Sequence, residues 1–235
     1  MVSFGYKDDE WKRIDNYLYK LYRNNISFYP TLGNHELFLF PKTGEQKFME
    51  RFPFYSKTGY SVNNGKTEII LLNSNFSDLT EKEIKKQETW YENKLNSLDK
   101  DTTIKAVIVA THHSPFTNSK IVSPSEEVQQ YFVPPFLRSK KAKVFISGHC
   151  HAFEHFEYKG KDFLVIGGGG GLQQPLYVGK EEKFVDLYST TDRIRMFHFL
   201  EYKLTNDTMH FIVKMLDKTF SNFHDEYELN IHVNN

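Results

Sequence analysis

The chain has 235 residues, of which 39% are hydrophobic and 26% charged, as is usual for a globular protein with room for one large α/β domain. Its 30 basic and 30 acidic side chains give a formal net charge of zero, which disfavours a nucleic-acid partner because phosphate backbones select basic faces. The single cysteine, Cys150, excludes a disulfide within the chain. No apolar run reaches the roughly 18 residues that a membrane span needs, and no signal-peptide pattern follows Met1. Compartment and oligomeric state stay open.

The first half of the chain alternates helical and strand-like patterns. Spacings of three and four between apolar residues, or short β-type runs, predict a helix over residues 8–24, a strand over 26–32, a short helix around 44–52 and a helix over 81–98. Asn63-Asn64-Gly65 lies between apolar runs and predicts a hairpin turn. Thr80 and Glu83 form the capping-box pattern that opens the last of these helices.

The second half of the chain is richer in buried-type strands. The pattern predicts strands over 103–113 and 143–151, a helix over 125–138 that is interrupted by two prolines, a hairpin over 155–171, and two long strands over about 194–204 and 208–216. The last dozen residues are polar and are expected to be loose. Strand–helix alternation predicts a layered α/β fold, in which ligands gather at the carboxyl ends of strands.

Polar chemistry begins where three of the predicted strands end, in Gly33-Asn34-His35-Glu36, in His112-His113 and in His149-Cys150-His151. Three separate segments would therefore converge at one edge of the sheet. For each segment alone the alternative is an ordinary polar loop, and Asn34 could serve only as a turn residue with positive φ. Together the three segments favour a shared site.

The residue types in these segments suit metal and phosphate chemistry. His149 and His151 flank one residue at a tight turn and could approach a metal cluster from adjacent directions. The amide oxygen of Asn34 is a neutral, hard ligand that suits Mg, Mn or Fe. His35 could donate a proton or a hydrogen bond to a charged substrate, and Glu36 could fix the orientation and tautomer of His35.

The order Gly-Asn-His-Glu, then His-x-Pro at residues 113–115, then Gly-His-x-His at residues 148–151, resembles the calcineurin-like metallophosphoesterases. Gln87-x-x-Trp90 is similar to a helix motif of that family, and "GHCHAFEH" (148–155) is similar to its purple acid phosphatase-like branch. The resemblance covers about residues 1–171. It implies an α/β fold, a four-layer αββα sandwich with two mixed sheets, in one domain over residues 1–235.

The resemblance also implies a reaction and its ligands. Two divalent or trivalent metal ions (Mn, Fe, Zn or similar) would share a bridging hydroxide that attacks a small-molecule phosphoester, with a phosphomonoester favoured. Its motifs make Asn34, His113 and His149 ligands of one metal and His151 a ligand of the other, while His35 contacts the substrate phosphate or its leaving group. His112 and His155 are further candidates for substrate contact. For both, the alternative is a structural role.

Two earlier family motifs, Asp-x-His and Gly-Asp, are absent from the sequence. We therefore expect an N-terminally incomplete domain without its first strands, which the upstream reading frame would test. Without carboxylate ligands we expect weak metal binding and little hydrolysis. Two alternatives remain open: a non-catalytic remnant that binds a phosphate ligand or a protein partner, and a mononuclear zinc protein that uses His113, His149 and His151.

Overall fold

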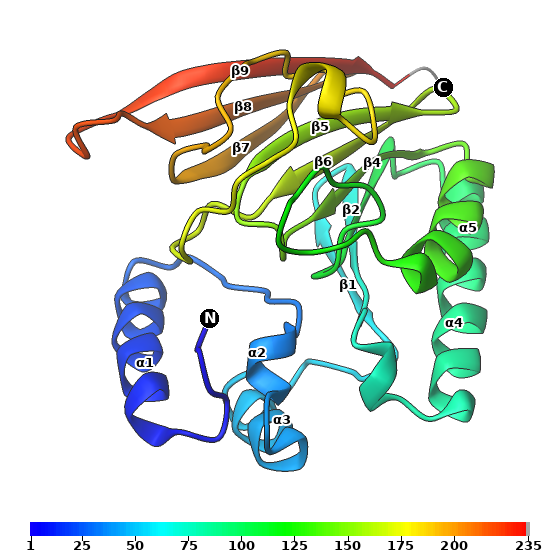
Figure 1. Cartoon of the computed structure of the whole chain (residues 1–235). Coiled ribbons are helices and arrows are strands. Elements are labelled where there is room, and N and C mark those ends of the chain that lie inside the picture. The colour runs from blue at the N-terminus through cyan, green and yellow to red at the C-terminus, as the bar shows by residue number, and fades with distance from the viewer. Residues whose placement is uncertain (234–235) are drawn as a thin grey trace.

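The computed structural model describes residues 1–233 and contains two facing β-sheets, with helices outside one sheet and a separate helical unit at its edge (Figure 1). The helices are α1 (Asp8–Arg23), α2 (Asn34–Leu37), α3 (Pro41–Arg51), α4 (Glu81–Lys100) and α5 (Val133–Arg138), with short turns η1 (Phe76–Asp78), η2 (Val128–Phe132, π-helical) and η3 (Gly179–Glu181). The strands are β1 (Tyr60–Asn64), β2 (Thr67–Leu71), β3 (Ala106–Ala110), β4 (Ala142–Ser147), β5 (Phe153–Tyr158), β6 (Lys161–Ile166), β7 (His198–Thr205), β8 (Thr208–Leu216) and β9 (Phe223–His232).

The larger sheet has six strands in the order β1-β2-β3-β4-β6-β5. The four central strands are mutually parallel, and the hairpins β1–β2 and β5–β6 add an antiparallel strand at each edge. The first hairpin turns at Gly65, whose φ of 64° suits glycine, so the prediction at Asn63-Asn64-Gly65 is confirmed. Parallel strands need cover on both faces.

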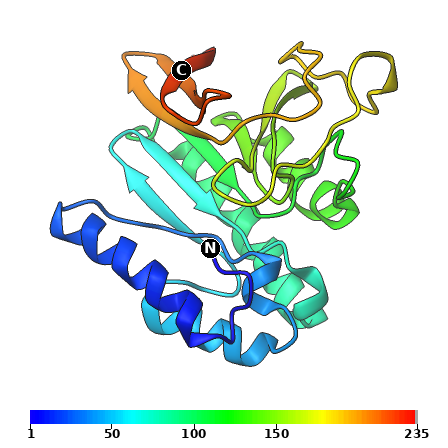
Figure 2. The ribbon, with the colours of Figure 1, turned by 60° about the vertical axis from the view of Figure 1, so that its left-hand side comes forward.

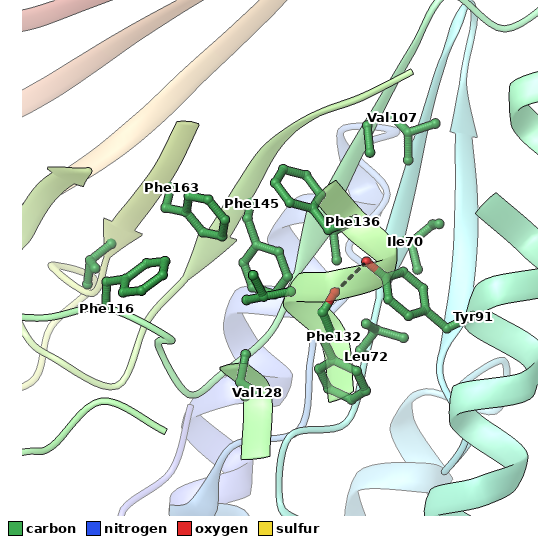
Figure 3. Close-up of a cluster of buried hydrophobic side chains, with 14 of the residues drawn as sticks. Ile70, Leu72, Tyr91, Val107, Phe116, Val128, Phe132, Phe136, Phe145 and Phe163 are labelled. Carbon is green, nitrogen blue, oxygen red and sulfur yellow. Dashed lines mark hydrogen bonds between the residues drawn. The ribbon is translucent and has the colours of Figure 1, made fainter. Parts of the chain in front are cut away.

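One face of this sheet is covered by α4, η2 and α5 (Figures 1 and 3). Phe145 and Phe163 stack on neighbouring strands with ring centroids 5.6 Å apart, and Phe136 of α5 packs edge-on against both. The Tyr91 hydroxyl on α4 donates to the Phe132 carbonyl at 3.3 Å and joins the two helical segments, as Figure 3 shows. The prolines of the predicted 125–138 helix lie in the first turn of α5, where a missing N–H costs no helical bond.

The opposite face packs on the three-stranded sheet β7-β8-β9. Met209, Phe211 and Val213 alternate inward along β8 and meet the six-stranded sheet. The sandwich expected from the resemblance is therefore present, with two differences in detail. The second sheet is antiparallel rather than mixed, and its outer face is solvent-exposed, with Glu201 and Lys203 outward, in place of a fourth layer.

The first 60 residues form a helical unit beside the β1–β2 hairpin (Figure 2). Trp11 and Phe48 are fully buried between α1 and α3, and the Trp11 indole donates to the Gly5 carbonyl at 2.6 Å. The strand predicted over 26–32 is wrong. In the described structure this segment pairs with no strand. The Tyr60 hydroxyl donates to the Pro30 carbonyl at 2.6 Å. Without a neighbouring strand to pair with its backbone, the strand-like composition does not suffice to form a β-strand.

The remaining elements agree with the sequence patterns, with one exception. The capping box of Thr80 and Glu83 opens α4, which ends two residues beyond the predicted 98. The strands β3 and β4 end earlier than predicted, so that the histidines lie in loops. In the polar C-terminal segment expected to be loose, residues 224–232 instead belong to β9, which pairs with β8, while residues 234–235 lie outside the described part of the chain. Within residues 1–233, no helix combines the length and apolar character needed to cross a membrane.

A buried polar network fastens the loop after β3 and the loop between β6 and β7 to strand β5, through Glu154, the His155 N–H and the Phe153 carbonyl. The Glu154 carboxylate accepts from the Thr117 hydroxyl at 2.5 Å and from the Asn118 backbone N–H at 2.7 Å. Asp186 accepts from Arg195 at 2.6 Å, and both side chains are almost inaccessible to solvent. Burial raises the pKa of Glu154 to about 7, more than its two donors lower it, so its neutral form is favoured in the fold.

We predict that Glu154 makes stability fall as pH rises. Its pKa is about 4.5 unfolded and about 7 folded, so the folded state holds a proton that the unfolded state has lost, and this contribution disappears as pH rises through about 7. Urea unfolding of wild type and Glu154→Gln, from about pH 4.5 to about pH 8, should show wild type losing roughly 3 kcal/mol relative to the variant. Parallel pH profiles would contradict the assignment.

Candidate metal centre

Three loops meet at the carboxyl ends of the adjacent parallel strands β2, β3 and β4. The loop after β2 carries Ser74, the loop after β3 carries His112 and His113, and the loop after β4 carries His149. Asn34, the first residue of α2, joins them from the N-terminal unit. The convergence predicted from the ends of the strands is thus realised for Asn34, His112, His113 and His149.

The polar atoms of this group point at one another. His112 Nε2 lies 2.8 Å from Asn34 Oδ1 and 3.1 Å from His149 Nδ1. One ligand atom from each of His112, His113 and His149 falls within 4.8 Å of the others. The ring centroids of His113 and His149 are 4.6 Å apart.

The loop after β2 is held by two buried side chains, Gln87 and Ser74, to which the sequence motifs give no role. Gln87 on α4 is fully buried, and its amide accepts from the Asn73 N–H at 2.8 Å and donates to the Asn73 carbonyl at 2.9 Å. The adjacent Ser74 hydroxyl then accepts from the His113 backbone N–H and contacts His113 Nδ1, both at 2.9 Å. The Gln-x-x-Trp pattern thus marks a residue that positions His113 indirectly.

The loop from the N-terminal unit is held just as closely. The Asn75 side chain donates to the Leu32 carbonyl at 2.9 Å and ties the segment before Asn34 to the β2 loop. At Gly33 a Cβ would lie 3.0 Å from His112 Nδ1 and 2.8 Å from Glu36 Oε2, so a larger residue would have to displace these side chains. Glycine therefore lets His112 and the Glu36 carboxylate pack closely against this turn.

His149 has a backbone conformation that is rare for a residue with a side chain. Its φ is +64°, and the Cys150 N–H closes a three-residue turn onto the Gly148 carbonyl at 2.7 Å. A second bond, from the Gly148 N–H to the His112 carbonyl at 3.0 Å, joins this turn to the loop after β3. Such strain persists only where surrounding contacts impose it, and it is concentrated at functional sites.

The local electrostatics keep these imidazoles neutral. Burial lowers the pKa of His112 well below its ordinary value, lowers that of His113, and lowers that of His149 to about 4. The neighbouring imidazoles further lower the pKa values of His112 and His149, because each would repel a second positive charge. Neutral imidazole is the form that binds metals, so no proton has to be displaced near pH 7.

The donor set fits a transition-metal ion. Three neutral imidazoles and an amide oxygen converge, and imidazole suits Zn, Cu, Fe and Ni while amide oxygen suits harder ions. The converging group contains no carboxylate among the described residues. The arrangement could hold a metal and polarise an oxygen-bearing ligand, with weaker attraction for hard cations than a carboxylate site.

His151 lies at the margin of this group. Its Nδ1 contacts the Leu172 carbonyl at 2.7 Å, and it is not among the three histidines whose ligand atoms converge. It is nevertheless close enough to His149 to contribute to the lowered pKa of that residue. Coordination of a metal by His151 stays a prediction.

The Glu36 carboxylate binds backbone groups rather than His35. It is 2% exposed, and its carboxylate accepts from the Gly33 N–H at 3.0 Å, the Val2 N–H at 3.1 Å and the Met1 ammonium at 2.7 Å. His35 is exposed and its Nδ1 contacts the Ser3 carbonyl at 3.0 Å, so Glu36 does not orient it. The prediction that Glu36 fixes the tautomer of His35 is wrong, because backbone donors occupy the carboxylate.

His155 lies elsewhere in the fold. On β5 it is 2% exposed, between the sheets, where its imidazole contacts the Tyr227 hydroxyl and the Asp162 carboxylate, each at 2.8 Å. These contacts favour a structural role for His155, and His155 is not part of the candidate site. Cys150 is also buried, in the core cluster under α4 and α5, so its sulfur faces away from the histidines.

Comparison with known proteins agrees with this geometry. The family model for calcineurin-like phosphoesterases matches residues 4–153, more than half of the chain. Among solved structures the chain is similar to a dimetal phosphatase from Danio rerio (13% identity, TM-score 0.55, covering 96% of this chain and 79% of that one). It is also similar to GAP50, the anchor in the inner membrane complex of Plasmodium (15%, 0.57, 75% and 55%), and to PhoD (13%, 0.50, 87% and 49%).

At these identities the structural likeness shows the fold alone, and the chain spans about half the length of the GAP50 and PhoD chains. The family match rests on the sequence itself and includes the loops that carry Asn34, His113, His149 and His151. The chain belongs to the calcineurin-like phosphoesterase family.

Proposed function

We propose that this chain is a metal-dependent phosphoester hydrolase that acts on small-molecule phosphomonoesters. The observation that carries the proposal is the convergence of neutral His112, His113 and His149 with Asn34 at the ends of parallel strands. Family membership supports hydrolysis of a phosphoester. The likeness of "GHCHAFEH" to the purple acid phosphatase-like branch supports a monoester, and the zero net charge speaks against nucleic acid.

In this proposal Asn34, His113 and His149 hold one metal ion and His151 contributes to a second, with Mn, Fe or Zn as candidates. Bound metal supplies Lewis acidity at the phosphoryl group. The described residues form one phosphoesterase domain. His35 is exposed at the rim of the group and donates its proton or a hydrogen bond to the leaving oxygen, while buried His112 orients Asn34 or contacts the phosphate.

The ligand assignment predicts a specific pattern of metal loss. Zinc affinity, measured by competition with a chromogenic chelator, should fall at least about tenfold in His149→Ala and His113→Ala, since even outer-shell changes cost that much. His210→Ala is the matched control, because His210 lies half-buried on β8, where its Nδ1 hydrogen-bonds Asn230 at 2.6 Å, outside the group of converging histidines. If His112→Ala alone lost affinity, the ligand from this loop would be His112 instead of His113.

The activity is tested with p-nitrophenyl phosphate and its bis-ester. We expect metal-dependent hydrolysis that a chelator abolishes, with the monoester preferred. The hydrolysis should be slow, because the converging group contains no carboxylate among the described residues to bind hard cations strongly. His35→Ala should lower kcat by about 100-fold, the usual contribution of a general acid. Faster hydrolysis of the bis-ester would replace the monoester assignment, and unchanged kcat in His35→Ala would remove the role of His35.

A second candidate is a non-catalytic protein that binds a phosphate ligand or a protein partner. The all-neutral donor set favours it, and one structural neighbour, GAP50, is described as an anchor. The same assay separates the two candidates. Phosphate binding by calorimetry without metal-dependent turnover would support the binding protein.

A further inference from the structure

We propose that four aromatic side chains beside His35 form the subsite for the leaving group, and that this subsite selects phosphomonoesters of flat, aromatic alcohols. The inference rests on the proposed function, because it assigns a substrate class to that site. We call Phe4, Tyr6, Phe38 and Phe40 the aromatic belt.

The aromatic belt is a continuous set of rings that begins at His35. The rings of His35 and Phe38 lie 6.3 Å apart between centroids, and Phe38 is 5.9 Å from Phe4. Phe4 is 6.0 Å from Tyr6, which packs edge-on against Phe40 at 4.8 Å. The spacings are those of favourable aromatic pairs, so the belt is preformed.

Part of the aromatic belt is unusually open to solvent. Phe38, Leu39 and Phe40 are 50%, 61% and 55% exposed. Leu39 has a φ of +66°, and the Phe40 N–H closes a turn onto the Phe38 carbonyl at 2.9 Å, a strained conformation for leucine. Three successive exposed apolar side chains, held in a strained turn beside a polar site, mark a binding surface.

Covalent connectivity specifies what this surface binds. If His35 donates to the leaving oxygen, the carbon attached to that oxygen lies next to His35, and Phe38 is the aromatic ring that neighbours His35. His35 directly follows Asn34 in α2, and Asn34 Oδ1 lies 2.8 Å from His112 Nε2, so His35 adjoins the histidine group. The Lys7 ammonium lies 4.3 Å over the Phe4 ring and adds a positive charge that favours an anionic ester.

A competing location for the leaving group is a cavity of about 240 Å³ beside His113. Its lining includes Ser74, Ser123, Ser125 and Glu127, which would suit a polyhydroxylated alcohol. The Glu127 carboxylate opposes an anionic ester there, and the cavity adjoins His113 rather than His35. These differences favour the aromatic belt, and the cavity becomes one outcome of the test.

The test compares two phosphonates that cannot be hydrolysed, phenylphosphonate and methylphosphonate, with the zinc-loaded full chain. Calorimetry gives their dissociation constants and amide NMR locates their contacts. We expect phenylphosphonate to bind about tenfold more tightly, which corresponds to the stacking and burial of one ring. Its additional amide shifts should fall at residues 38–40.

Three variants sharpen the comparison. Phe38→Ala should bring the ratio of the two dissociation constants close to one, and Phe38→Leu, which keeps apolar bulk without a ring, should lower it in part. Phe223→Ala is the matched control, since Phe223 is also 50% exposed but lies on β9, and it should leave the ratio unchanged.

Equal affinities for the two phosphonates, or a ratio unaffected by Phe38→Ala, would overturn the inference while leaving the phosphate site intact. Phenyl-specific shifts at residues 123–127 would move the leaving group to the serine-lined cavity and would also overturn it. If neither phosphonate bound, the phosphate site itself would fail and both proposals would fall.

Discussion

Close packing of three partly buried imidazoles at the carboxyl ends of β3 and β4 is the constraint on which the rest of the site depends. Burial disfavours their protonated forms, so each neutral ring needs hydrogen-bond partners or a cation, and here the nearest partners are Asn34, Ser74 and the other imidazoles. The strained turn at His149 and the glycine at position 33 both serve this close approach. The six-stranded sheet makes it possible, because parallel neighbours end at one edge.

The N-terminal unit contributes residues to the candidate site and is joined to the six-stranded sheet. It supplies Asn34 and His35 to the site and is joined to the β2 loop through Asn75 and to β1 through Tyr60. Its own core is aromatic, with Trp11, Phe48 and Phe52 packed inside, and its exposed rings flank the site. Recognition of the organic part of a ligand therefore depends on how the helices of this unit are held, while the donor atoms depend mainly on the sheet.

Sequence patterns identified the strands that matter because β3 and β4 are apolar runs bounded by histidines, and Thr80 and Glu83 revealed the start of α4. Sequence patterns gave wrong predictions where pairing with another strand decides whether a segment forms a β-strand. Residues 26–32 have strand composition but no ladder partner in the described structure, whereas β9 is polar yet turns Tyr227, Leu229 and Ile231 toward the sandwich core.

The same limit explains the misassigned side chains. Glu36 follows His35 directly, but α2 turns its carboxylate toward the backbone at Gly33, Val2 and Met1, which no motif could indicate. His155 ends the "GHCHAFEH" segment that made it a candidate for substrate contact, yet on β5 it contacts Tyr227 and Asp162 between the sheets. Adjacency in sequence thus located the site but did not specify which neighbour each polar group would contact.

The inward orientation of Cys150 bears on which metals and oxidants this centre tolerates. Burial raises the pKa of its thiol to about 12, so the sulfur stays protonated between two histidines that flank the site. Because the sulfur lies in the core cluster, a soft cation such as Cd²⁺ or Cu⁺ held by the imidazoles does not reach it, and peroxide in the solvent does not reach it either. The fold thus places a cysteine next to the histidines of the candidate site in the sequence while keeping its sulfur apart from them.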